Sequence, residues 1–178
     1  MFRFSSEQLR SRRLLAPIAT WMMIGLGASP AFGKEEAETM GTEVQEQPSP
    51  AVAAVWEMED AYWRYVQSGD VDNYLTLWHE DFIGWPCAMN ALHPVGKESI
   101  SLWVEDIRVE KVKFGYRLQR EAGQDFGPVV AVHYSTPMIY QYPDGRVTGQ
   151  DQTYKFTHTW LWNGTGWQII SGMCAPLE

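Results

Sequence analysis

The first regular pattern along the chain lies between residues 50 and 68, where apolar side chains recur at the spacing of one face of an α-helix. The positions on that face are Val52, Val55, Trp56, Glu59, Tyr62, Trp63 and Val66. Ser49 and Pro50 supply a favoured N-cap and a proline for the first helical position, and Ser68-Gly69 supplies a stop. The pattern therefore predicts a helix from Pro50 to Ser68.

A second, shorter helix is predicted directly after this stop. Asp70 can cap a helix over residues 71–78, and His79 would end it, where the helix dipole favours an imidazolium. The apolar side of this helix carries Tyr74, Leu77 and Trp78. The chain then extends through residues 82–85 and breaks at Pro86.

After a loop over residues 87–96, a third helix is predicted over residues 97–107. Its inward-facing positions are Ile100, Leu102, Trp103 and Ile107. From Lys111 onward the period changes from that of a helix to that of a strand. The strands are predicted at residues 112–120, 129–142, 147–162 and 167–174, with hairpin turns at 142–146 and 163–166. Helices followed by an antiparallel meander indicate an α+β fold, with three N-terminal helices on a curved sheet.

The N-terminal segment has the composition of a secretory signal peptide. Four arginines precede an uncharged apolar run over residues 14–26, and small residues over 28–33 suit cleavage after Gly33. The run is shorter than the roughly 20 residues of a spanning helix, and an uncleaved membrane anchor is the alternative. Residues 34–48 are acidic and lack periodicity, so we expect a flexible linker before a domain over residues 49–178. Such a leader predicts a periplasmic or secreted protein.

The charge of the chain excludes one class of partner. It carries 14 Lys and Arg against 22 Asp and Glu. Without the four arginines and the single glutamate of residues 1–33, ten basic residues face 21 acidic ones, a net charge near −11. Such a chain repels phosphates, so we expect neither nucleic acid nor an anionic membrane surface as a partner. No later segment is long and apolar enough to span a bilayer, so we expect no stable membrane insertion after cleavage.

Several local strings stand in a characteristic order between Val52 and Ala175. They are Ala61-Tyr62-Trp63 before Ser68-Gly69-Asp70-Val71-Asp72, then Leu77-Trp78-His79-Glu80-Asp81-Phe82, then Gly96-Lys97-Glu98, and the terminal hairpin over residues 159–170. Together they resemble the NTF2-like superfamily, in particular its SnoaL-like and DUF4440 branch, which is related to ketosteroid isomerase. The resemblance implies a cone whose curved, mixed and mostly antiparallel sheet wraps the first helix and leaves a pocket at its open end. It also implies a homodimer formed through the outer sheet face.

Carried over residue by residue, the isomerase site is incomplete. Tyr62 falls where the isomerases have the phenol that hydrogen-bonds the substrate oxygen, and His158 falls where they have a protonated acid as second donor. Their general base would fall at about Pro86, which cannot accept a proton. The resemblance therefore implies a ligand pocket but not ketosteroid isomerase activity.

Two residues are candidates for acid/base chemistry. His158 belongs to a row of alternate strand positions, which the resemblance assigns to the concave face: Tyr154, Phe156, His158, Trp160 and Trp162. This histidine is either a general acid or base, or a hydrogen-bonded residue that only shapes the pocket. Glu59 lies in the middle of the apolar face of the first helix, where a carboxylate that reaches the pocket would replace the missing base. The alternative is that Glu59 lies at the edge of this face and pairs with a neighbouring cation or hydroxyl.

The aromatic content suits the walls of a pocket. The chain has 9 Trp, 8 Tyr and 7 Phe, more than a small core needs, and such walls favour a small apolar or aromatic ligand. The residues expected to contact it are Trp63, Trp85, Tyr154, Phe156, Trp160 and Met173. The sequence contains no phosphate-binding glycine loop, nucleotide fingerprint or metal-ligand spacing, so we expect no cofactor and no metal site.

The resemblance also implies a position for the two cysteines, Cys87 and Cys174. It implies parallel first and last strands whose ends carry these residues, and export would permit a disulfide across the pocket rim. Two free thiols are the alternative, because strand parity can point the side chains apart.

Two functions are predicted. The first is the binding of a small, largely apolar molecule, with or without isomerase, dehydratase or hydrolase-type chemistry by His158, Glu59 and Tyr62. The second is a non-catalytic, dimeric interaction or assembly module.

Overall fold

The computed structural model describes residues 47–87 and 93–177. The predicted signal peptide, residues 1–33, and nearly all of the predicted linker, residues 34–46, lie outside the described residues, as do residues 88–92 of the predicted loop. Among the described helices, none combines the length and the hydropathy needed to cross a membrane.

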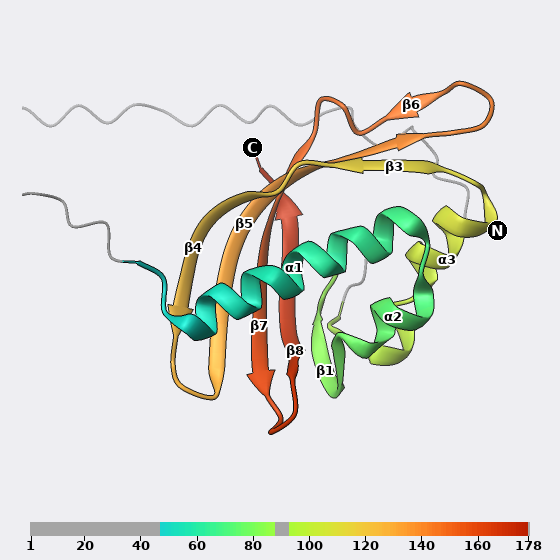
Figure 1. Cartoon of the computed structure of the whole chain (residues 1–178). Coiled ribbons are helices and arrows are strands. Elements are labelled where there is room, and N and C mark those ends of the chain that lie inside the picture. The colour runs from blue at the N-terminus through green and yellow to red at the C-terminus, as the bar shows by residue number, and fades with distance from the viewer. Residues whose placement is uncertain (1–46, 88–92, 178) are drawn as a thin grey trace, which may run out of the picture. The chain divides into compact units, whose positions relative to one another are not determined.

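Helix α1 spans Pro50–Ser68, as the periodicity predicts. The Ser49 hydroxyl caps its N-terminus by accepting a hydrogen bond from the Val52 amide at 3.2 Å. At the other end Gly69 adopts a φ of 68°, a left-handed conformation that glycine tolerates, and its amide closes the last turn. The apolar face of α1 is buried, and Figure 1 shows the helix lying across the strands of the sheet.

Helix α2 is shorter than predicted and spans Val71–Thr76. Trp78, predicted as the last helical residue, instead begins strand β1, so His79 lies in a strand and the prediction that it ends a helix is wrong. The helix ends early because of a tertiary contact. The Leu77 carbonyl accepts a hydrogen bond from the Ile169 amide of the last strand at 2.7 Å, so the chain joins the sheet at this point.

The third predicted helix is divided in two. A 3₁₀ turn, η1, spans Lys97–Ser99, and helix α3 spans Leu102–Val109. A 3₁₀ turn contains three residues where an α-helix contains 3.6, so it rotates the phase of the residues that follow. The prediction that Leu102 faces the core is wrong, since it is 51% exposed, whereas Val104 is fully buried.

An eight-stranded sheet forms the second layer, with the central strand order β2-β1-β8-β7-β5-β3. The strands are β1 (Trp78–Trp85), β2 (Val95–Gly96), β3 (Lys113–Tyr116), β4 (Gln119–Asp125), β5 (Val129–Gln141), β6 (Val147–Thr148), β7 (Thr153–Trp162) and β8 (Trp167–Pro176). Strand β5 is long enough to pair with β3 and β4 along one edge and with β6 and β7 along the other. Among the described strands, β1 and β8 are the parallel pair and the remaining pairs are antiparallel, so the sheet is mixed and mostly antiparallel, as predicted.

Two of the predicted strands are interrupted. The segment 112–120 is divided between β3 and β4, and the segment 147–162 between β6 and β7. In the second break Gly149 has a φ of 81°, and a Cβ there would collide with the carbonyl oxygen of Met138. Only glycine fits this turn, which a pattern of alternating residues does not reveal.

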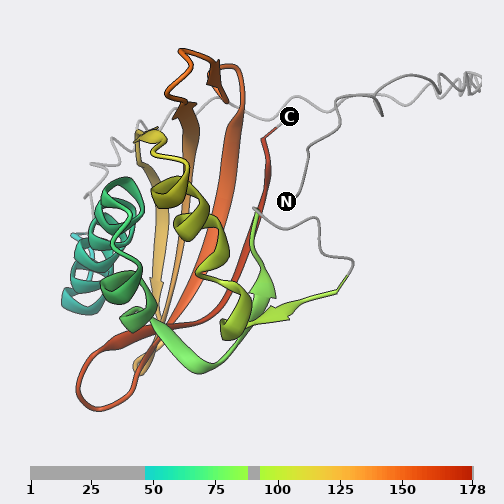
Figure 2. The same cartoon turned by 90° about the vertical axis from the view of Figure 1, so that its right-hand side faces the viewer.

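The helices cover the concave face of the sheet (Figure 2). Alternation along β7 decides which side chains meet them, because Phe156, His158 and Trp160 are buried whereas the residues between them are only partly so. Trp162, the last member of the predicted row, is 44% exposed. The result is an α+β cone, with N-terminal helices inside a curled mixed sheet, in which the middle of α1 packs against β7.

Candidate functional site

Glu59 is a carboxylate in the interior of this cone. It comes from the middle of α1, and its side chain has no exposed surface. Its Oε1 atom accepts two hydrogen bonds from β7, from Nδ1 of His158 at 2.8 Å and from Nε1 of Trp160 at 2.7 Å. The helical phase therefore predicted its inward direction correctly, and the alternative of an edge position is wrong. Glu59 does not line the pocket described below, however, so the hypothesis that its carboxylate reaches the pocket is also wrong. The buried carboxylate is tolerated because two N–H groups, two residues apart on one strand, converge on it.

His158 connects this carboxylate to a pocket. Its Nδ1 atom lies 2.8 Å from Glu59 Oε1 and 3.3 Å from the hydroxyl of Tyr134. The shorter contact, to the carboxylate, keeps the N–H of a neutral imidazole on Nδ1 and leaves Nε2 as the acceptor. Next to Nε2 the neighbouring strand β8 has Gly172, where a Cβ would approach ring atom Cδ2 to 2.9 Å. Glycine therefore leaves room beside this edge of the ring.

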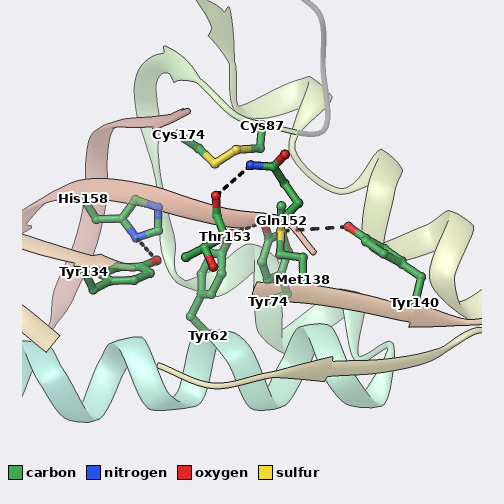
Figure 3. Close-up of a disulfide and its surroundings, with 10 residues drawn as sticks. All are labelled: Tyr62, Tyr74, Cys87, Tyr134, Met138, Tyr140, Gln152, Thr153, His158 and Cys174. Carbon is green, nitrogen blue, oxygen red and sulfur yellow. Dashed lines mark hydrogen bonds between the residues drawn. A yellow bond between two sulfur atoms is a disulfide. The ribbon is translucent and has the colours of Figure 1, made fainter. Parts of the chain in front are cut away.

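Two further tyrosines, Tyr62 and Tyr74, are hydrogen-bonded to each other, and Figure 3 draws them together with His158 and Tyr134. Tyr74 of α2 accepts a hydrogen bond from Nε1 of Trp103 at 3.1 Å and donates one to the hydroxyl of Tyr62 at 3.4 Å. The ring of Tyr62 lies 5.2 Å from the ring of His158, centroid to centroid. Because the Tyr74 proton is directed at the Tyr62 oxygen, the Tyr62 proton is available to a third group. In addition to the Tyr134 hydroxyl, the arrangement therefore provides one hydroxyl donor, that of Tyr62, beside the histidine.

Burial keeps these phenols neutral. Desolvation raises the pKa of Tyr62, and the neighbouring Tyr74 raises it further. Burial likewise raises the pKa of Tyr134, with an added effect from the negative charge of Glu59. At neutral pH these hydroxyls are donors rather than bases, so proton exchange at this site falls to Glu59 and His158.

A small pocket opens beside His158. Its inner wall includes Tyr62, Tyr74 and Trp78, which are buried, and its rim includes Trp85 and Met173, which are about half exposed. The cavity volume is about 30 Å³, enough for about two water molecules. Among the described residues that line it, none is Lys, Arg, Asp or Glu. The walls therefore suit a small, uncharged molecule.

Three of the six predicted ligand contacts line this pocket, namely Trp85, Phe156 and Met173. Trp63, Tyr154 and Trp160 do not line it, and Trp63 and Trp160 are fully buried in the core. The pocket is also lined by Trp78 and by the hydrogen-bonded pair of Tyr74 and Trp103, which were predicted to face the core but not to contact a ligand. All three lie on predicted apolar segments, and periodicity does not distinguish a ring that fills the core from one that borders a pocket.

Cys87 and Cys174 form a disulfide at the pocket (Figure 3), with Cα atoms 4.9 Å apart. Strands β1 and β8 are parallel and pair Trp85 with Met173, which brings the cysteines beyond those positions together. The predicted disulfide is confirmed, and the alternative of two free thiols is wrong.

The site has no counterpart of the general base that the resemblance to the isomerases predicts. Pro86, at the position expected for it, lines the pocket but offers no proton acceptor. Within residues 47–87 and 93–177, no three side chains of His, Cys, Asp or Glu gather in a way that could hold a metal ion. The described proton acceptors at this pocket are therefore His158 and the carboxylate behind it.

The chain is similar in structure to proteins with the NTF2-like fold. An NTF2-like protein from Cytophaga hutchinsonii has a TM-score of 0.54 and 17% identity, over 70% of this chain and 97% of that one. A ketosteroid isomerase-like protein from Erwinia carotovora atroseptica has a TM-score of 0.59 and 15% identity, over 74% and 99% of the two chains. The CaMKII hub of S. rosetta has a TM-score of 0.58 and 20% identity, over 73% and 99%. No family model and no curated protein matches the sequence. At these identities the likeness establishes the NTF2-like fold alone.

Proposed function

We propose that this chain is an exported domain of the SnoaL-like or DUF4440 branch that binds a small, largely apolar molecule and exchanges a proton with it through His158. The observation that carries the proposal is the buried hydrogen bond of 2.8 Å between Glu59 and Nδ1 of His158, whose ring lines the pocket. Burying a carboxylate away from water raises the free energy of the folded state. Behind an imidazole, the same carboxylate provides the orientation and charge that a general base needs.

The proposed mechanism follows from the direction of the protons. Glu59 holds the ring proton on Nδ1, so Nε2 of neutral His158 offers its lone pair to the ligand. Nε2 removes a proton from a carbon or oxygen of the ligand, and the carboxylate stabilises the imidazolium that forms. Tyr62 donates a hydrogen bond to the ligand oxygen on which negative charge develops. The imidazolium then returns the proton to another atom of the ligand, which completes an isomerisation or assists the departure of water in a dehydration.

The class of ligand follows from charge and size. The described lining residues offer no charged partner for an ionic ligand, and the aromatic walls favour an apolar body with one oxygen. The cavity of about 30 Å³ is far smaller than the several hundred Å³ of typical drug-sized sites. A molecule of a few heavy atoms, such as a small ketone, is therefore the expected ligand, and a larger one would have to displace the half-exposed rim residues.

Proton exchange of acetone, a ketone of four heavy atoms, in D₂O, followed by proton NMR, tests this function. Wild-type protein should accelerate loss of the α-proton signal over buffer, and His158→Gln should abolish the acceleration. His133→Gln is the matched control, because His133 lies on the adjacent strand and is hydrogen-bonded to Thr157 at 2.9 Å, away from Glu59. Equal rates for wild type and His158→Gln would refute the proposed role.

A second candidate function, a homodimeric assembly module, is favoured by the smallness of the cavity, because the chain's own aromatic rings fill most of the cone. Ile83, Trp85 and Met173 are about half exposed on the adjacent strands β1 and β8, and would meet a second copy of this chain. Native mass spectrometry of protein from its own host distinguishes the two functions. A dimer without any bound small molecule favours assembly, and a co-purified small molecule favours the pocket.

Export is proposed from the leader, and the Cys87–Cys174 disulfide supports it because such bonds persist in oxidising compartments. The mass of the mature protein should correspond to cleavage after Gly33. An intact N-terminus on protein recovered from the cytoplasm would contradict export.

A further inference from the structure

Trp160 lies behind the pocket, in contact with the carboxylate that holds His158. Its Nε1 atom donates to Glu59 Oε1 at 2.7 Å, and the same oxygen accepts from His158 Nδ1 at 2.8 Å. The exposed fractions of Trp160, Glu59 and His158 are 0%, 0% and 4%. The other carboxylate oxygen, Oε2, has no hydrogen-bond partner among the described residues. The carboxylate is therefore held through one oxygen by two N–H groups.

The two donors differ in what they can do with a proton. An imidazole gains or loses a proton near neutral pH, whereas an indole N–H only donates and does not ionise. The hydrogen bond from Trp160 therefore stabilises the charge of the carboxylate without being able to neutralise it. In a dry interior such a charge-assisted bond is stronger than its counterpart in water.

We infer that Trp160 is a positioning residue that keeps Glu59 ionised and directed at His158, and so sets the pH range in which Nε2 of His158 is an unprotonated base. The inference rests on the proposed acid/base function of His158. Without the indole, the charge on Glu59 loses part of its stabilisation, so the Glu59–His158 pair binds a proton more readily. The base form then disappears at a higher pH than in the wild type.

Among the described residues, the other titratable groups that face Glu59 are tyrosine hydroxyls: Tyr62 of α1, Tyr74 of α2 and Tyr134 of β5. Burial raises the pKa of each, so all three stay neutral while a histidine titrates. No lysine, arginine, aspartate or second glutamate is a hydrogen-bond partner of Glu59 or His158 in the described part of the chain. A change in the midpoint of proton uptake can therefore be assigned to the pair.

The experiment is a pH titration of the full chain, labelled with ¹⁵N-histidine, by NMR. The chain has four histidines, and the His158 signals are those missing from His158→Gln. The wild type should show a neutral ring with its proton on Nδ1. In Trp160→Phe the midpoint should rise by about one to two pH units, the equivalent of one hydrogen bond to a charged group. Trp162→Phe is the matched control, since Trp162 lies two residues further along β7 and is 44% exposed, and its midpoint should not move.

An unchanged midpoint in folded Trp160→Phe would show that the indole only fills space, and would overturn the inference. If that variant does not fold, 3-benzothienylalanine at position 160 retains the ring volume and removes only the N–H, and the same upward shift is expected. The proposed function fails separately, when His158→Gln leaves acetone exchange unchanged. Loss of exchange in His158→Gln without any shift in the Trp160 variants overturns the role of Trp160 alone.

Discussion

Removal of the disulfide in Cys87→Ala/Cys174→Ala should destabilise the domain without changing its fold. The bond joins residues separated by 87 positions. In the chain-entropy description, closing a loop of that length raises the free energy of the unfolded state by about 4.6 kcal/mol at 25 °C. Alanine keeps the Cβ and introduces no polar atom, so the packing of these two partly buried sites changes little. Because the free energy of unfolding of a whole domain is only about 5–15 kcal/mol, we expect the variant to fold but to lose much of its stability.

Urea unfolding followed by tryptophan fluorescence measures this loss. For a domain of this size the midpoint should fall by roughly 2 M. Wild-type protein in excess reductant should unfold at the same urea concentration as the variant, because both lack the same bond. The intact mass of the wild type should show that the disulfide is formed. If the free energy of unfolding then falls by less than about 1 kcal/mol in the variant, the entropic account is refuted.

Three further outcomes are expected. Glu59→Leu should lower the free energy of unfolding by about 3–5 kcal/mol, because two buried N–H groups lose their acceptor, and Glu59→Gln should cost less in the same urea titration. Gly172→Ala should reduce acetone exchange at least about tenfold, because its Cβ would lie 2.9 Å from the His158 ring, whereas Gly115→Ala, with a nearest contact of 3.7 Å, should not. Burial raises the pKa of Tyr62 above its ordinary value of 10.0, so its contribution to stability is fully present below pH 10.0 and is lost as the pH rises further. Urea midpoints should therefore fall above that pH, and ultraviolet absorbance should show phenolate appearing together with unfolding.

Local sequence signals were sufficient to predict both ends of helix α1. Ser49 and Gly69 mark its two ends, and each acts on backbone groups a few residues away. The end of α2 was mispredicted, because the residue that ends it, Leu77, is engaged by Ile169 from the last strand. Leu102 was mispredicted for a related reason, since the turn before it changed the helical phase.

The sequence by itself determined that Glu59 lies on the apolar face of its helix and that His158 shares a strand face with Phe156 and Trp160, because a period of 3.6 or 2 relates a side chain to its own helix or strand. It was the resemblance that assigned this strand face to the concave side. Only the tertiary structure decided that the two side chains touch, that Trp160 donates to the same oxygen, and that Trp85 rather than Trp63 borders the pocket. The physical reason is that a hydrogen bond of 2.8 Å between residues 99 positions apart depends on how a helix packs on a curved sheet. No local pattern specifies that packing to within the length of a bond.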